Sequence, residues 1–131
     1  MLSPYRVLDL TDHRGEIAGM ILGDLGADVI RVEAPGGSPA RQAAPLLAHA
    51  PEGDGSLQFY AYNRNKRSIV LALQEESDRR AFLDLVAGAD FVLESGPGSE
   101  LETAGISFET LASAQPQIVH VKLTPFGVDG P

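Results

Sequence analysis

Two short apolar runs, separated by a segment with helical periodicity, limit what the start of this chain can fold into. Residues 6–10 and 28–33 are rich in Val, Leu and Ile, and Ile17, Met20, Ile21 and Leu25 recur between them at helical spacing. A strand, a helix and a strand within about 30 residues form a βαβ unit. Its two strands are expected to be parallel. Gly26 is expected to end the helix, because glycine readily adopts the left-handed conformation found there.

The same alternation continues to the end of the chain. We expect a short helix near residues 59–62, a buried strand over 68–73, a helix over 75–88, a strand over 91–93, a helix over 107–114 and a strand over 118–123. The pattern predicts the α/β class, as one domain over residues 1–131. Its architecture is a Rossmann-like, doubly wound, mainly parallel sheet of about five strands with helices on both faces.

Residues 35–56 interrupt this pattern. They are rich in Gly, Pro and Ala, and we expect a long loop with a helical turn at 40–48. Loops of this length inside a domain often carry function or contact a partner. A mobile excursion without function is the alternative.

Composition excludes several classes of protein. The net charge is −8, and an acidic chain is a poor ligand for nucleic acid, whose phosphates are bound mainly by Lys and Arg. The absence of cysteine excludes a disulfide scaffold, a thiol nucleophile and a zinc–cysteine site. Apolar runs are too short for a membrane span, which needs about 18 residues or more. The first residues do not have the form of a signal peptide, so we expect a cytoplasmic protein.

Local motifs exclude the common nucleotide sites. Thr11–Glu16 follows the first predicted strand without a Gly-x-Gly-x-x-Gly turn, and the chain has no Walker phosphate loop. It also has no Gly-x-Ser-x-Gly elbow. No metal site is expected. The histidines lack a second ligand at suitable spacing and are interpreted as structural or exposed: His13, His49 and His120.

Carboxylates and basic residues near the predicted strand ends have two interpretations each. Asp9, Glu33 and Glu94 could be catalytic, but an acidic residue there more often hydrogen-bonds a neighbouring turn, which we favour. The densest basic group is Arg64, Lys66 and Arg67. It could bind an anion, but composition favours a turn whose charges pair with nearby carboxylates.

Three stretches together resemble the opening of CoA-transferase family III (the CaiB/BaiF type) and of the related acyl-CoA racemases. They are Val-Leu-Asp-Leu-Thr at 7–11, Leu-Gly-Asp-Leu-Gly-Ala-Asp-Val-Ile-Arg-Val-Glu at 22–33 and Asn-Arg-Asn-Lys-Arg-Ser at 63–68. Residues 89–94 and 126–131 also fit. The resemblance implies the N-terminal part of a Rossmann-like large domain in an interlocked homodimer. Coenzyme A is implied as a substrate, with no metal and no redox cofactor.

The resemblance also implies a reaction. An aspartate attacks an acyl-CoA thioester and becomes an aspartyl-CoA thioester by way of an anhydride, before CoA passes to a carboxylic acid acceptor. In the racemase branch, a histidine and an aspartate exchange a proton beside the thioester. These residues lie beyond residue 131, so we expect no catalytic residue here. We expect a fragment that is inactive alone and is completed by further residues or by a second chain.

The CoA contacts implied by the resemblance lie at three strand ends: Arg14 and Gly15; Leu71, Ala72, Leu73 and Gln74; Ser95 and Gly96. Several neighbouring positions depart from the family pattern. Ala34, Gln74 and Thr103 stand where members carry basic residues, and the turn at 95–98 is short. Each lost charge-assisted contact would cost roughly 1.5–3 kcal/mol of binding. A non-catalytic, transferase-like domain for assembly or regulation, and part of an acyl-CoA racemase, therefore remain alternatives.

Overall fold

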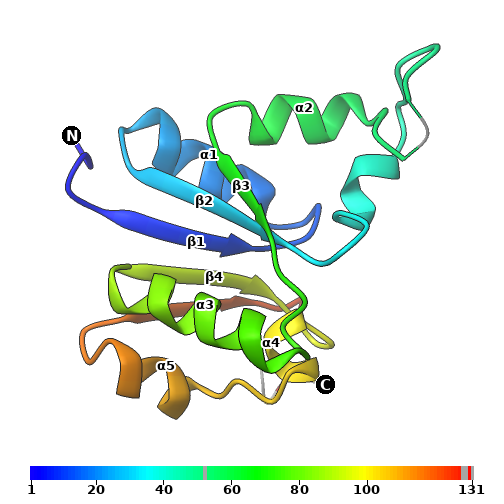
Figure 1. Cartoon of the computed structure of the whole chain (residues 1–131). Helices are drawn as coiled ribbons and strands as arrows, with labels where there is room; N and C mark the ends of the chain where they lie inside the picture. The colour runs from blue at the N-terminus through cyan, green and yellow to red at the C-terminus, as the bar shows by residue number, and fades with distance from the viewer. Residues whose placement is uncertain (52, 128–129, 131) are drawn as a thin grey trace.

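The computed structural model describes residues 1–51, 53–127 and 130, and its centre is a five-stranded parallel sheet (Figure 1). The strands are β1 (Arg6–Leu10), β2 (Asp28–Glu33), β3 (Arg67–Val70), β4 (Phe91–Ser95) and β5 (Val119–Leu123). Their order is β3-β2-β1-β4-β5. The chain therefore winds outward from β1 in one direction and then in the other. The predicted doubly wound α/β fold is confirmed.

Helices cover both faces of the sheet, as Figure 1 shows. One face carries α1 (Glu16–Asp24) and α2 (Leu57–Asn63). The other carries α3 (Glu76–Ala87), the short α4 (Glu100–Thr103) and α5 (Phe108–Ala114). Ser107 caps α5 as the sequence suggests, with its hydroxyl accepting from the Thr110 N–H. Gly26 follows α1 with a φ of +101°, which is the expected left-handed helix end.

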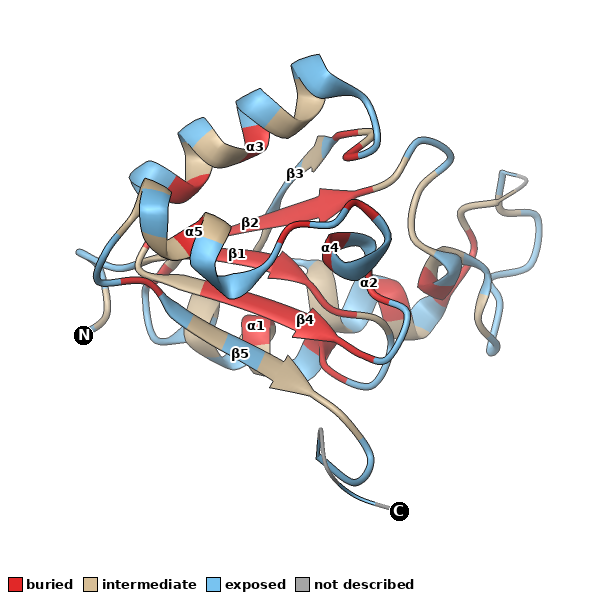
Figure 2. Cartoon of the chain, turned by 90° about the horizontal axis from the view of Figure 1, so that it is seen from below, coloured by how far each residue is buried: buried red, intermediate tan, exposed pale blue. Residues whose placement is uncertain are grey.

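The apolar core is divided between the two faces. The larger cluster lies under α3 and α5 and includes Leu8, Phe82, Val86, Val92 and Leu111, each 0% exposed. The smaller cluster lies under α1 and is built on Val7, Val29 and Leu93. Figure 2 shows burial concentrated in the central strands β1, β2 and β4, while β3 and β5 at the two edges are more exposed.

One local prediction was wrong, and another was right only in part. The expected buried strand at 68–73 is the four-residue edge strand β3, in which only Ile69 is half-buried. Leu71 and Leu73 are buried, but they lie beyond the strand and pack with the core under α3. The expected helical turn at 40–48 is a 3₁₀ helix, η1, at Pro39–Gln42. It stops early, since a residue that precedes proline, here Ala44, disfavours helical geometry.

The orientation of α1 is unusual for an amphipathic helix. Ile17, Ile21 and Leu25 are between 41% and 49% exposed, whereas Glu16 and Gly19 are buried. The helix therefore turns a charged residue and a glycine toward the sheet. The reason is a buried polar network beneath it.

Candidate functional site

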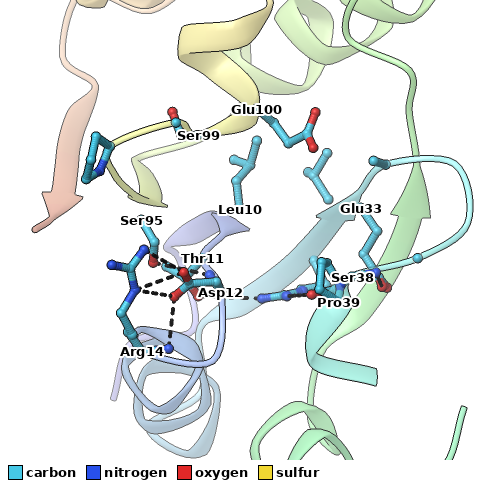
Figure 3. Close-up of a pocket in the computed structure, with 16 residues that line it drawn as sticks. Leu10, Thr11, Asp12, Arg14, Glu33, Ser38, Pro39, Ser95, Ser99 and Glu100 are labelled. Atoms are coloured by element: carbon cyan, nitrogen blue, oxygen red, sulfur yellow. Dashed lines mark hydrogen bonds and ion pairs between the residues drawn. The ribbon is translucent and has the colours of Figure 1, made fainter. Parts of the chain in front are cut away.

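A pocket of about 190 Å³ opens at the carboxyl ends of β1, β2 and β4 (Figure 3). Strand order reverses between β1 and β4, and ligands of doubly wound sheets bind beyond the strand ends at this switch point. Sites that enclose a whole small molecule measure roughly 300–1,000 Å³. The pocket therefore has room for part of such a ligand. Its lining mixes polar and apolar residues: Leu10, Thr11, Asp12, Arg14, Arg31, Val32, Glu33, Ala34, Gly37, Ser38, Pro39, Ser95, Pro97, Gly98, Ser99 and Glu100.

Asp12, Arg14 and Ser95 join the two sides of the switch point. The Asp12 N–H donates to Ser95 Oγ at 3.2 Å, which ties the loop after β1 to the end of β4. Arg14 donates to the Asp12 carboxylate through Nε at 2.9 Å and through its backbone N–H at 2.9 Å. Burial alone would raise the pKa of Asp12, but the hydrogen bonds from Arg14 outweigh it and lower the pKa to about 2. The Arg14 charge is thus offset at the pocket mouth.

Gly37, Ser38 and Pro39 form the wall beyond β2. The Ser38 N–H donates to Glu33 Oε2 at 2.9 Å, and Arg31 Nη2 donates to Ser38 Oγ at 3.0 Å. Burial opposes ionisation of Glu33, yet hydrogen bonds from Arg41, Ser38 and Ser68 lower its pKa to about 2. The wall is therefore held by an ionised, buried carboxylate.

A buried network of four charged residues lies under α1, beside this wall. Asp9 accepts from Lys66 Nζ at 2.7 Å and from the Thr11 N–H at 2.9 Å. The predicted role of Asp9 in the following turn is confirmed. Arg31 approaches Asp9 at 3.5 Å and Glu16 at 3.2 Å. Burial lowers the pKa of Lys66 and raises that of Glu16, which shows the cost of ionising both groups in this interior.

The basic group at 64–67 is committed to ion pairs. Arg64 pairs with Asp24 at 2.8 Å, Lys66 with Asp9 at 2.7 Å and Arg67 with Asp28 at 2.6 Å. The three basic residues therefore pair with carboxylates as the sequence favoured, although Lys66, at 1% exposure, is buried. The sequence motif at 63–68 holds β3, α1 and β1 together.

The absence of a side chain at Gly19 leaves room for Asp9 and Lys66 of the buried charge network under α1, and a substitution there tests how closely these groups pack. Replacing a helix glycine by alanine ordinarily stabilises by about 1 kcal/mol. A Cβ at Gly19, however, would lie 2.4 Å from Asp9 Oδ2 and 3.0 Å from Lys66 Nζ. We expect Gly19→Ala to destabilise the chain by about 1–3 kcal/mol instead. Urea denaturation measures the change, and a gain in stability would contradict this close packing.

Glu94 and His120 form a second buried pair, on the opposite face of the sheet. His120 Nε2 lies 2.9 Å from Glu94 Oε1, and the His120 ring stacks on Phe108 at a centroid distance of 6.3 Å. Burial opposes ionisation of Glu94, but the bond to His120 and the charge of Lys122 leave its pKa lowered. The pair joins β4 to β5, so His120 has a structural contact as expected, whereas Glu94 bonds to a strand rather than to the expected neighbouring turn.

The residues expected to contact CoA do not all meet at the pocket. Arg14 and Ser95 line it, whereas the remaining six are not among the described lining residues. Gly15 precedes α1, and a Cβ there would lie 2.7 Å from Thr11 Cβ. Leu71, Ala72, Leu73 and Gln74 follow the edge strand β3, and Gly96 packs against Lys122.

Sequence reasoning missed several residues that line the pocket from loops, including Ser38 and Ser99. Ser99 caps α4, its hydroxyl accepting from the Glu102 N–H at 3.2 Å. The Ser-x-x-Glu pattern at 99–102 is a capping-box signal that could have predicted this turn. The described part of the chain holds no cluster of three or more potential metal-ligating His, Cys, Asp or Glu residues. Nor does any helix within it have both the length and the apolarity to span a bilayer.

The fold and the pocket define a Rossmann-like α/β protein with a pocket at its switch point. The chain belongs to CoA-transferase family III, which it matches over residues 2–131. It is 37% identical over 129 residues to a subunit of succinyl-CoA:(R)-benzylsuccinate CoA-transferase from Thauera aromatica, covering 98% of this chain and 32% of that protein. A probable fatty acyl-CoA transferase from Mycobacterium tuberculosis is 39% identical, with 99% of this chain and 33% of that protein covered.

Solved structures agree with this assignment. A CaiB/BaiF family protein from Brucella suis superposes with a TM-score of 0.86 at 37% identity, covering 99% of this chain and 35% of that protein. The chain thus spans about a third of the length of these relatives. The resemblance stated from the motifs is confirmed.

Proposed function

We propose that this chain is the N-terminal α/β portion of an enzyme that transfers coenzyme A between carboxylic acids. The observation that carries the proposal is a pocket, lined by polar and apolar residues, at the switch point of a family III sheet. Arg14 and Ser95, two of the residues expected to contact CoA, line that pocket from opposite sides of the switch point. A volume of about 190 Å³ suits one portion of CoA and leaves the rest outside.

In this proposal the chain binds and orients CoA, and the nucleophile is an aspartate outside residues 1–131. The carboxylate attacks the thioester carbonyl of an acyl-CoA, the C–S bond breaks and CoA leaves as a thiolate. The thiolate then attacks the aspartyl carbonyl of the resulting anhydride and releases the first acid as a carboxylate. A carboxylic acid acceptor reverses these steps. The remaining parts come from further residues, or from a second chain, in a homodimeric assembly.

A second candidate is a non-catalytic, transferase-like domain, and the charge balance of the pocket favours it. Arg14 and Arg31 line the pocket, but Arg14 is paired with Asp12, and Arg31 contacts Asp9 and Glu16. Ala34 presents only a methyl group at a position where some members carry a cation. A CoA phosphate would therefore compete with carboxylates for its partners.

Calorimetric titration with CoA and with acetyl-CoA, at low and moderate salt, separates the two candidates. A CoA site predicts micromolar affinity that weakens with salt, because the ligand is an anion. Arg14→Ala should weaken binding about tenfold, equivalent to about 1.4 kcal/mol.

Arg80 provides the matched control, since it is an exposed arginine that pairs with Glu76 on α3. Arg80→Ala should leave the affinity unchanged. If neither ligand gives heat at millimolar concentration, the CoA site is refuted and the non-catalytic domain is supported.

A further inference from the structure

Arg41 contacts three separate parts of the chain from the end of η1. Its Nε and Nη2 donate to the two oxygens of Glu33 at 2.7 and 2.8 Å, in a bidentate pair with the end of β2. Its Nη1 donates to Asp54 Oδ1 at 2.9 Å. The guanidinium also lies 4.2 Å from the ring centroid of Phe59 on α2, a cation–π distance. One side chain thus connects β2, the far end of the loop and α2.

The backbone of Arg41 closes the same loop. Its carbonyl accepts from the N–H groups of Gly55 and Ser56, at 3.2 and 3.0 Å. The two ends of the 41–56 segment are therefore adjacent in space, as in a compact surface loop whose ends lie close together. Without these contacts, the described part of this loop has few other bonds to the body of the domain.

The link to the pocket runs through Glu33. Its Oε2, which receives Arg41 Nε, also accepts the Ser38 N–H at 2.9 Å. Gly37 lies against the side chain of Arg41, since a Cβ at Gly37 would be 2.9 Å from Arg41 Cδ. Gly37, Ser38 and Pro39 line the pocket, while Arg41 is not among its described lining residues.

We propose that Arg41 is a positioning residue that holds the 37–39 wall of the switch-point pocket in its binding geometry through Glu33. The expected effect of Arg41 on CoA affinity rests on the proposed function, whereas its expected effect on the geometry of the 37–39 wall does not. Arg41 makes no contact with the ligand in this proposal. A charge-assisted bidentate pair is directional, so a lysine cannot reproduce both bonds to Glu33 together with the bond to Asp54.

Amide hydrogen exchange by NMR tests the wall without any ligand. In Arg41→Ala we expect exchange at Ser38, Gly55 and Ser56 to rise at least tenfold, while amides of β1 and β4 keep their protection. Arg41→Lys should give an intermediate rise, and Arg80→Ala none. Unchanged exchange at these three amides in Arg41→Ala would overturn the proposal. If Arg41→Ala loses protection throughout, Arg41→Lys decides, because it retains the charge and must then show a rise confined to the loop.

Calorimetric titration with CoA tests the effect on the pocket. Arg41→Ala should bind about tenfold more weakly and Arg41→Lys should lose a smaller factor, both with the salt dependence of the unmodified chain, because no contact with a phosphate is lost. A reduced salt dependence would mean direct contact, and unchanged affinity despite a loosened wall would mean no positioning role; either result overturns the proposal. If the unmodified chain does not bind CoA, the proposed function fails, and the exchange rates alone decide whether Arg41 holds the wall.

Discussion

Asp9→Ala is expected to destabilise the fold by about 3–5 kcal/mol, the largest effect of any single change considered for this chain. The Asp9 side chain is 0% exposed and faces Lys66 and Arg31, whose side chains are 1% and 3% exposed. Removing the carboxylate leaves two buried cations with Glu16 as their only nearby carboxylate within the described network. Urea denaturation of the two proteins at neutral pH measures the difference.

Asp24→Ala provides the matched control. Asp24 also pairs with a basic residue of the 63–68 segment, but this pair with Arg64 is about half exposed. Exposed pairs contribute about 0–1 kcal/mol, so the control should lose no more than that. Similar losses for the two substitutions would show that burial of the Asp9 network does not govern stability.

Glu33→Gln is expected to lower stability by about 3 kcal/mol at neutral pH, and this deficit should disappear in acid. The pKa of Glu33 falls from its ordinary value of 4.5 to about 2 in the folded chain. A carboxylate with a lowered folded-state pKa stabilises above its unfolded pKa and loses that contribution as the pH falls through the folded value. The window is therefore pH 4.5 to 2, with roughly half of the difference left near pH 3.

Denaturation curves of both proteins at several pH values between 7 and 2 test this dependence. Asp84→Asn, at an exposed position on α3, should change stability by less than about 0.5 kcal/mol at each pH. A deficit in Glu33→Gln that stays constant across the window would show that the Glu33–Arg41 pair does not depend on ionisation. The cause would then be packing around the amide.

The central part of the fold follows from the sequence with little ambiguity. The bounds of β1 and β2 agree with the expected runs, because a short apolar run on each side of a helix has few other solutions. The edge strand β3 was misjudged because Ser-Ile-Val-Leu has the same composition at an edge as at the centre of a sheet. Its exposure depends on which strands pair, and this is decided by topology.

The site was harder to predict, because its residues meet only after folding. Lys66 and Asp9 are 57 positions apart, and no local pattern pairs them. Ser38 and Ser99 reach the pocket from loops whose shape depends on capping bonds. The motifs that carry the family resemblance, by contrast, contain the scaffold residues Asp9, Arg31 and Lys66. They identify the family strongly and say little about the acyl group.

Lys66 is the last member of the buried charge network along the chain. The βαβ unit of residues 6–33 can form while Asp9 and Glu16 are still hydrated, and Lys66 joins only when the turn before β3 returns to β1. Closing this longer loop costs entropy, so we expect the contact to form late in folding. Interactions absent from the transition state slow unfolding and leave the folding rate almost unchanged. The network should therefore govern how long the folded chain survives between unfolding events, and so the rate of cleavage by a protease abundant enough to cut each unfolded chain before it refolds.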